Sequence, residues 1–504
     1  MKLSRLIFTT STALGLSMTA VLADGNETEL AQSGNDNSTL IDQSLATNSD
    51  VGVLGSIPAA TQNGDDNVLV ISQAGDANRI ASNAAAAILL QDGTENNGSI
   101  EQSRTIPPTS PSTSTGNVVT VMRQEGAGND VTISQTSDQN RNYANVRQNN
   151  AGNSADGNTA SVTQVNTAPD NQNANRNEVS SGPGHVGGVV QNGKRNTAAV
   201  EQQGQGLRLR LLEQVGDDND ANVVLTGVDN GQPDLTVGGP SGSVGAFSRE
   251  VLQLGDLNQT DVNISGMANA YGVKQQGNEN DALGIMVTGN NNSVGVGQFG
   301  DLNEISLATV AGDLNSIGFE QVGNENFALA TVNGNQNEAL VSQVGDRNET
   351  RLDVDGNFNE AELKVTGDDN YLNGFQKQRR NDMFVTLDGS GNNNLLASDP
   401  FNGSALIARD FVRASGGLKS ADFRRGDLIQ IGYGGSGNSR NSVFITGTNA
   451  DNNSFATYQN GNRNATVGSI TDGTMNQAVV AQIGDDNSAT FSQVGNGNNA
   501  GIIQ

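Results

Sequence analysis

The sequence predicts an all-β fold, a parallel β-solenoid with two short strands in each coil of about 22 residues, interrupted by loop inserts. Three observations predict it: asparagines recur every eleven residues, apolar and polar residues alternate between them, and glycine marks the turns. The composition agrees, since 34% of the residues are hydrophobic, 4% are aromatic and 63 are glycine. An ordinary compact core is hard to build from this composition, because soluble domains are about 45–50% apolar.

The eleven-residue repeat is clearest between residues 315 and 381, where every step of eleven ends on an asparagine. Glutamines follow a period twice as long, so two similar halves form one coil. Stacked side-chain amides hydrogen-bond along such a stack and thereby satisfy polar groups that are costly to bury unpaired. We therefore predict a stacking ladder made of Gln253, Gln276, Gln298, Gln321, Gln343, Asn280, Asn303, Asn326, Asn337, Asn348, Asn359 and Asn370.

Within each half, the inward positions follow a period of two. Steps of two from Asn337 lead to Ala339, Val341, Gln343 and Gly345. Strict alternation over about seven residues is typical of a half-buried strand. The Gly-x-x-Asn that follows predicts a tight turn, because Gly and Asn adopt positive φ at little cost.

The repeats form blocks that are separated by inserts. Lys2 and Arg5 precede an apolar stretch, which predicts a signal peptide over residues 1–23. The repeat blocks are predicted over residues 24–102, 117–230, 250–397 and 427–504. The inserts are a Pro/Ser/Thr-rich segment 103–116, a loop 167–188 inside the second block, a Gly/Pro segment 231–249 and a basic, apolar segment 398–426. In the last insert we expect a short helix, with either a recognition role or the role of a tolerated loop.

Charge and composition exclude several classes of function. The formal net charge of −27 disfavours nucleic acid as a partner, because phosphate binding needs clustered Lys and Arg. The absence of cysteine removes disulfides and thiolate metal sites. The single histidine, His185, lies in a Ser-Gly-Pro-Gly-His segment and cannot form a zinc site alone. We expect no enzymatic activity and no catalytic, cofactor-binding or specific metal site.

Paired acids are the remaining candidates for chemistry. They occur at Asp65/Asp66, Asp217/Asp218, Asp368/Asp369 and Asp485/Asp486, always in the same Gly-Asp-Asp-Asn turn. Turn propensity explains them better than the carboxylate pairs of a polysaccharide lyase or hydrolase. Glu338, Glu360 and Asp382 also recur one coil apart, so like charges should stack, and weak calcium binding is compatible with this. We expect acid or divalent cations to speed assembly.

The repeat Gln-x-Gly-x-x-Asn-x-Ala-x-Val-x-Gln resembles the curlin repeat of curli fibre subunits. The frame recurs over residues 32–43, 62–73, 124–135, 191–202 and 482–493, and the likeness covers most of the chain after residue 23. The resemblance implies a secreted amyloid fibre subunit of a Gram-negative biofilm matrix, exported through an outer-membrane channel and nucleated at the cell surface. This chain is several times longer than the familiar curlins and carries inserts, which leaves open whether it is main subunit, nucleator or adhesin.

The first and last repeats point to self-assembly. A solenoid normally needs units that cover its open edges, and neither of these repeats looks different from the others. We predict two terminal assembly rungs, each with the four inward residues of a half-coil: Asn26, Thr28, Leu30 and Gln32, and Asn498, Ala500, Ile502 and Gln504. The expected partner is the protein itself, as a homopolymer with a nucleator subunit. The alternatives are terminal coils that merely fray, and a monomeric secreted β-solenoid adhesin or surface-binding protein.

Overall fold

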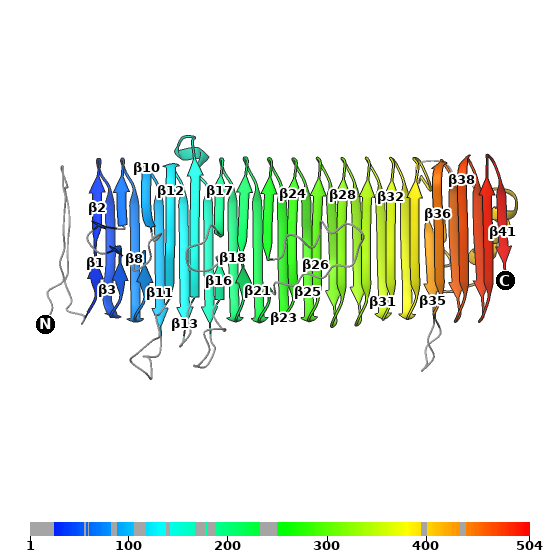
Figure 1. Cartoon of the computed structure of the whole chain (residues 1–504), viewed down its shortest axis with the longest axis horizontal. Helices are drawn as coiled ribbons and strands as arrows, with labels where there is room; N and C mark the ends of the chain where they lie inside the picture. Colours follow the sequence, from blue (N-terminus) through cyan, green and yellow to red (C-terminus); the bar gives the residue numbers. More distant parts are fainter. Residues whose placement is uncertain are drawn as a thin grey trace. The chain divides into compact units, whose positions relative to one another are not determined.

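The computed structural model describes residues 25–54, 57–58, 60–81, 88–104, 117–137, 142–166, 177–179, 187–231, 249–394, 401–432 and 440–504. The chain forms two compact units, one of residues 1–233 with 248–269 and one of residues 234–247 with 270–504. In each unit the chain alternates between two parallel sheets, which we call sheet A and sheet B (Figure 1). The predicted parallel β-solenoid is confirmed.

In the first unit, sheet A contains β1 (Glu27–Thr28), β2 (Leu30–Ser33), β4 (Asp50–Val51), β7 (Ala60–Asn63), β9 (Arg79–Ile80), β10 (Ile88–Thr94), β12 (Val118–Ala127), β14 (Asn142–Asn150), β16 (Asn177–Val179), β17 (Gly188–Asn192), β19 (Arg208–Leu209), β20 (Leu211–Val215) and β22 (Glu250–Leu254). Sheet B contains β3 (Ser38–Thr47), β8 (Val68–Asp76), β11 (Asn97–Arg104), β13 (Asp130–Ser137), β15 (Thr159–Asn166), β18 (Thr197–Gln205), β21 (Asp220–Val228) and β23 (Gln259–Met267). Outside the coils, β5 (Val53–Leu54) and β6 (Ile57–Pro58) pair antiparallel, and a short 3₁₀ helix, η1, covers Ser154–Asp156.

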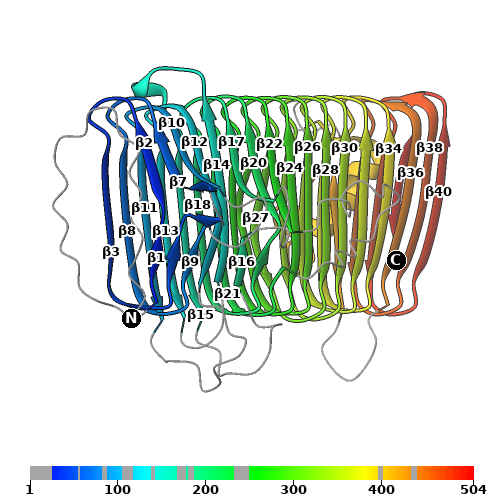
Figure 2. The same cartoon turned by 60° about the vertical axis from the view of Figure 1, so that its left-hand side comes forward.

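In the second unit, sheet A contains β24 (Ala270–Gln276), β26 (Ser293–Phe299), β28 (Ser316–Val322), β30 (Glu338–Val344), β32 (Glu360–Thr366), β34 (Asp382–Asp388), β36 (Ser442–Asp451), β38 (Ala465–Thr474) and β40 (Ser488–Val494). Sheet B contains β25 (Asp281–Asn290), β27 (Glu304–Ala311), β29 (Phe327–Asn333), β31 (Glu349–Asn357), β33 (Tyr371–Arg379), β35 (Asp427–Ile431), β37 (Ser454–Asn460), β39 (Gln477–Ile483) and β41 (Asn499–Ile503). Turns join the strands of the two sheets at both ends of each coil (Figure 2).

The core of each coil is the set of alternate residues that the sequence predicts. In β30, Ala339, Val341 and Gln343 are buried, and Glu338 is exposed. Glu338 pairs in register with Glu360 of β32, so one coil of this region contains 22 residues. The thin interior is therefore filled by small, aliphatic and amide side chains from both sheets.

The strands on either side of an insert keep the register of the solenoid. Gln148 of β14 stacks on Gln191 of β17 although 43 residues separate them. Gln376 of β33 stacks on Gln430 of β35 across a separation of 54 residues. A longer connecting segment can replace a tight turn because the free energy of loop closure grows slowly with loop length.

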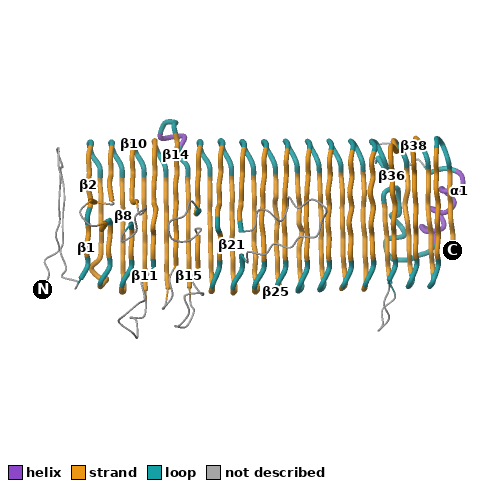
Figure 3. Tube along the Cα trace, in the orientation of Figure 1, coloured by secondary structure: helices purple, strands orange, loops and turns teal. Residues whose placement is uncertain are grey.

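The expected helix of the last insert is α1 (Gly403–Ala414), and it lies on the outer face of sheet B. Figure 3 shows it near the last strands of the chain. Ala405, Ala408 and Val412 of α1 pack against Val479 and other outward apolar residues of this sheet. The insert thus forms a small second core outside the solenoid.

Several predictions concern residues outside the described part of the chain. These are the signal peptide, His185 and most of the inserts 103–116, 167–188 and 231–249. Among the described residues, no helix is long and apolar enough to cross a membrane.

Candidate functional site

Within the asparagine ladder, Asn348 shows how every polar group of a buried side chain is satisfied. The backbone N–H and Nδ2 of Asn348 donate to Oδ1 of Asn326, at 3.0 and 3.1 Å. Nδ2 also donates to the carbonyl oxygen of Gly367, at 2.7 Å. Oδ1 of Asn348 in turn accepts from the backbone N–H and Nδ2 of Asn370, at 3.1 and 3.0 Å. Burying an amide group without hydrogen-bond partners is strongly unfavourable. Because all polar atoms of this side chain are hydrogen-bonded, the amide is buried at little cost in free energy.

All the asparagines predicted for the ladder lie in it. Each is at most 1% exposed, and they fall into two columns, one before the strands of sheet B and one before those of sheet A. The first column contains Asn280, Asn303, Asn326, Asn348 and Asn370, and the second contains Asn337 and Asn359. The Asn–Asn hydrogen bonds in both columns point the same way, because each Asn donates to the Asn of the coil before it.

The glutamine ladder has the opposite direction, since each Gln donates to the coil after it. Nε2 of Gln298 donates to Oε1 of Gln321 at 3.0 Å, and Gln321 donates to Gln343 at 2.9 Å. In the first unit, Gln253 accepts from Gln214 at 2.8 Å. The two ladders together therefore give a coil two chemically different edges.

Gln276 does not belong to the ladder, which corrects one of the predicted positions. Gln276 is exposed, whereas its neighbour Gln275 is buried and donates to Oε1 of Gln298 at 2.9 Å. Two consecutive glutamines made the period ambiguous. The preceding Asn269 resolves it, because the inward glutamine lies six residues after the asparagine.

In the second unit the buried glutamines change from sheet A to sheet B, which the sequence period did not predict. The sheet A ladder ends at Gln343, which stacks on Val365. A new ladder runs through sheet B along Gln376, Gln430, Gln459, Gln482 and Gln504. Oε1 of Gln376 is buried without a hydrogen-bond partner, because the preceding position in its column is Val354.

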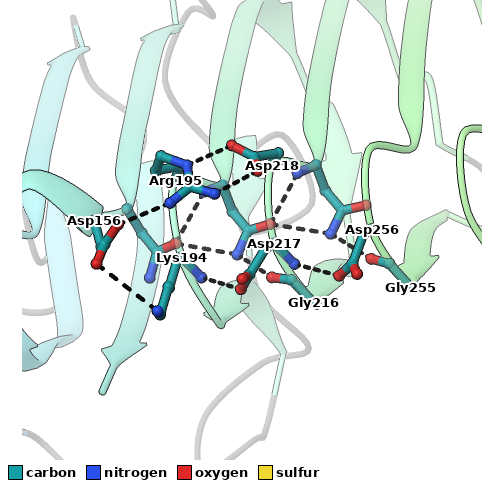
Figure 4. A network of polar contacts seen from close by, with 11 residues as sticks. Asp156, Lys194, Arg195, Gly216, Asp217, Asp218, Gly255 and Asp256 are labelled. Atoms are coloured by element: carbon teal, nitrogen blue, oxygen red, sulfur yellow. Dashed lines mark hydrogen bonds and ion pairs between the residues drawn. The ribbon is translucent and has the colours of Figure 1, made fainter. Parts of the chain in front are cut away.

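The first aspartate of each paired-acid turn accepts a backbone hydrogen bond from the coil before it. Oδ1 of Asp217 accepts from the N–H of Lys194 at 2.9 Å, and Asp256 accepts from the N–H of Asp217 at 2.7 Å (Figure 4). Asp346 and Asp368 make the same contacts in the second unit. These carboxylates hold the turns together.

In three of the four turns the second aspartate, which has a positive φ, meets an arginine of the coil before it: Asp218, Asp369 and Asp486. In the fourth turn, Asp66 follows Asp36 instead. Arg347 makes two hydrogen bonds to Asp369, at 2.8 and 3.0 Å, and these bonds lower the pKa of that carboxyl. Arg195 pairs with Asp218 in the same way and also reaches Asp156 (Figure 4). Among the described residues, no group of three or more His, Cys, Asp and Glu side chains is arranged to hold a metal ion.

The first rung lies at one edge of the first unit. Nδ2 of Asn26 donates to the carbonyl of Ala46 at 3.0 Å, and Thr28 donates to Oε1 of Gln43 at 2.9 Å. Gln32 donates to Gln62 of the following coil. β1, β2 and β3 pair with β4, β7 and β8, and each has a strand on one side only among the described residues.

The last rung lies at one edge of the second unit. Asn498 donates to Oδ1 of Asn476, Ala500 and Ile502 lie in β41, and Gln504 accepts from Gln482 at 2.8 Å. β40 pairs with β38 and β41 with β39, and within the described chain no strand follows on the other side. Oδ1 of Asn498 thus occupies an acceptor position that a further Asn fills in earlier coils.

A comparison with protein-family models finds none that matches the chain, and a comparison with curated proteins finds no significant match.

Proposed function

We propose that the protein is a secreted structural subunit of curli-like amyloid fibres, which grow when copies stack coil upon coil. On this proposal the fibre serves cell adhesion and the biofilm matrix on the surface of a Gram-negative bacterium. Export by a signal peptide is expected from the N-terminal sequence, whereas an outer-membrane channel and a nucleator subunit are implied by the curlin resemblance. The observation that supports stacking is the match between the two open edge coils.

The match holds residue by residue. If Asn26 of one copy follows Asn487 of another, Gln32 falls on Gln493 and Gly34 on Gly495. The next half-coil then places Asn37 on Asn498, so both asparagine columns continue. Strand pairing at the junction would repeat the spacing of about 4.8 Å that is typical of cross-β fibres.

The ladders give this stacking a direction. At the last rung, the Oδ1 atom of Asn498 needs donors from a following coil, and Asn37, in the half-coil after the first rung of the next copy, would supply them. If equivalent asparagines met, contact between two last edges would place acceptor against acceptor, and contact between two first edges would place donor against donor. Stacking is therefore head-to-tail, which gives an open filament instead of a closed dimer.

Gly495 provides a test that leaves the isolated protein nearly intact. At earlier turns, a Cβ on the equivalent glycine would collide with the next coil; on Gly34, for example, it would lie 1.9 Å from the carbonyl oxygen of Gly64. A Cβ on Gly495 meets nothing within 4 Å. We expect Gly495→Ala to fold, with a small strain from its φ of +84°, and to block addition of the next copy.

Gly497→Ala is the matched control. Gly497 also has positive φ, +67°, but it occupies the turn position where Asp66, Asp369 and Asp486 tolerate a side chain in other coils. Electron microscopy and fibre diffraction should show fibres with a reflection at about 4.7 Å for the wild type and Gly497→Ala, but not for Gly495→Ala. A folded wild-type protein that stays monomeric would contradict the proposal and favour the monomeric adhesin.

A further inference from the structure

The helix α1 is fastened to the last strand of sheet B. The backbone N–H of Ala405 donates to Oδ1 of Asn499 at 2.8 Å, and Oγ of Ser404 donates to the same atom at 2.7 Å. Nδ2 of Asn499 donates back to the carbonyl oxygen of Asn402 at 2.8 Å. Gly501 lets the helix come this close, since a Cβ there would lie 2.0 Å from the carbonyl oxygen of Ser404.

One flank of α1 faces the earlier coils. Leu406 packs against the cluster that α1 forms with sheet B, and Nε of Arg413 donates to the carbonyl oxygen of Phe423 at 2.8 Å. The ring of Phe423 packs edge-on against Tyr458 of β37, with centroids 5.9 Å apart. Because helical residues advance by about 100°, Leu406 and Arg413 share this side of the helix.

The opposite flank is exposed and carries two large apolar side chains. It carries Ser404, which contacts β41, together with Ile407 and Phe411, which are 64% and 41% exposed. Since the other flank faces β37, this one faces the side of β41 that has no neighbouring strand. Figure 3 shows part of α1 beyond the last strand.

A second exposed apolar patch lies on the same sheet in the first two coils. Leu40 and Leu45 of β3 are 57% and 78% exposed, and Val68 and Val70 of β8 are 38% and 37% exposed. Leu40 pairs in register with Val70, so the two form one outward column. Large apolar side chains on the outer face of an edge strand are unfavourable in water unless a partner covers them.

Head-to-tail stacking brings the two patches together. Asn37 on Asn498 places Leu40 on Gly501, and Val479, which α1 already covers, precedes Gly501 in that column. We propose that α1 is an intermolecular clamp, which packs Phe411 and Ile407 of one copy over Leu40 and Val70 of the next. This inference rests on the proposed fibre and names the surface that joins its subunits.

Engineered cysteines test the contact directly, because the chain contains none of its own. A Phe411→Cys, Leu40→Cys protein should form disulfide-linked ladders when its fibres are oxidised, and no such ladders as a monomer. A Val467→Cys, Leu40→Cys protein is the control, since Val467 is 48% exposed on sheet A. Equal cross-linking of both proteins in fibres, or none of either, would overturn the clamp.

A variant that removes the apolar side chains of α1 tests the clamp separately from the proposal that the protein forms fibres. We expect Ile407→Ser with Phe411→Ser to raise the monomer concentration left at the end of assembly by about tenfold, because two apolar side chains lose their cover. Val467→Ser should leave it unchanged. If wild-type protein forms fibres and the double variant matches it, the clamp is wrong and the fibre stands; if wild-type protein forms none, both are wrong.

Discussion

The N–H and Nδ2 of Asn348 both donate to Oδ1 of Asn326, a residue one coil earlier, at 3.0 and 3.1 Å. The same pair of bonds repeats along each asparagine column. One side chain therefore links its own turn to the coils before and after it, which explains how a chain so poor in apolar residues builds an ordered interior.

Asn348→Ala should lower the free energy of unfolding by about 2–4 kcal/mol, because the variant loses the bond from Nδ2 to Asn326 and leaves Asn370 without its acceptor in a buried place. Urea denaturation of the monomeric protein measures this. Asn222→Ala is the control, since Asn222 faces outward in β21, and its effect should stay within about 0.5 kcal/mol. Equal midpoints for the two variants would contradict the structural importance of the ladder.

Gln275 and Gln276 form a natural matched pair. Gln275→Ala removes the bonds of Nε2 to the carbonyl oxygen of Asn280 at 2.7 Å and to Gln298 at 2.9 Å, and should cost about 1.5–3 kcal/mol. Gln276→Ala changes an exposed side chain and should be nearly neutral. The denaturation midpoints of the two variants test this. A larger loss of stability for Gln276→Ala than for Gln275→Ala would place the ladder at Gln276.

The carboxylates of Glu338, Glu360 and Asp382 stack in register, as expected from the sequence. Burial raises the pKa of Glu360, and the like charges of Glu338 and Asp382 raise it further. A raised pKa means that the ionised form destabilises the fold above that pKa, and that proton uptake removes the penalty as the pH falls through it. Glu360→Gln should therefore stabilise the protein at about pH 7 and weaken its response to acid down to about pH 4.

Asp369→Asn is the control of opposite sign. Arg347 lowers the pKa of Asp369, so this pair contributes stability at neutral pH that is lost as the pH falls through the lowered pKa. The variant should destabilise the protein at neutral pH and have little effect in strong acid. Denaturation curves at neutral pH and in strong acid distinguish the two carboxylates. If Glu360→Gln and Asp369→Asn changed the stability at neutral pH in the same direction, the opposite roles of the two carboxylates would be contradicted.

Asp427, beside α1, should respond to mild acid. It is 3% exposed, and burial raises its pKa to about 6 in spite of hydrogen bonds from Nδ2 of Asn373 and the N–H of Arg424. Since the pKa in the folded state is raised, stability should increase as the pH falls from about 7 to about 5. Asp427→Asn should remove this dependence, and a wild-type protein that loses stability over that range would contradict the prediction.

The glutamine ladder shows where the sequence repeat stops predicting which residues are neighbours. The 22-residue period identifies Gln298, Gln321 and Gln343, but it does not reach from Gln376 to Gln430, because the helical insert lies between them. Only the pairing of β33 with β35 shows that these two residues are neighbours. The prediction that Gln276 lies in the ladder was wrong for another reason, since the glutamine period alone cannot choose between two adjacent glutamines.

The sequence by itself determined the coil: its two strands, its turns and the inward positions from Asn to Gln. It could do so because strand geometry imposes a period of two and because stacking places every equivalent residue on the next. Only the tertiary structure decided what covers the outside of the solenoid. Apart from short columns such as Glu338, Glu360 and Asp382, the outward positions vary from coil to coil. The period therefore does not indicate that α1 packs over Val479 and Gly501 or that its exposed flank lies beside β41.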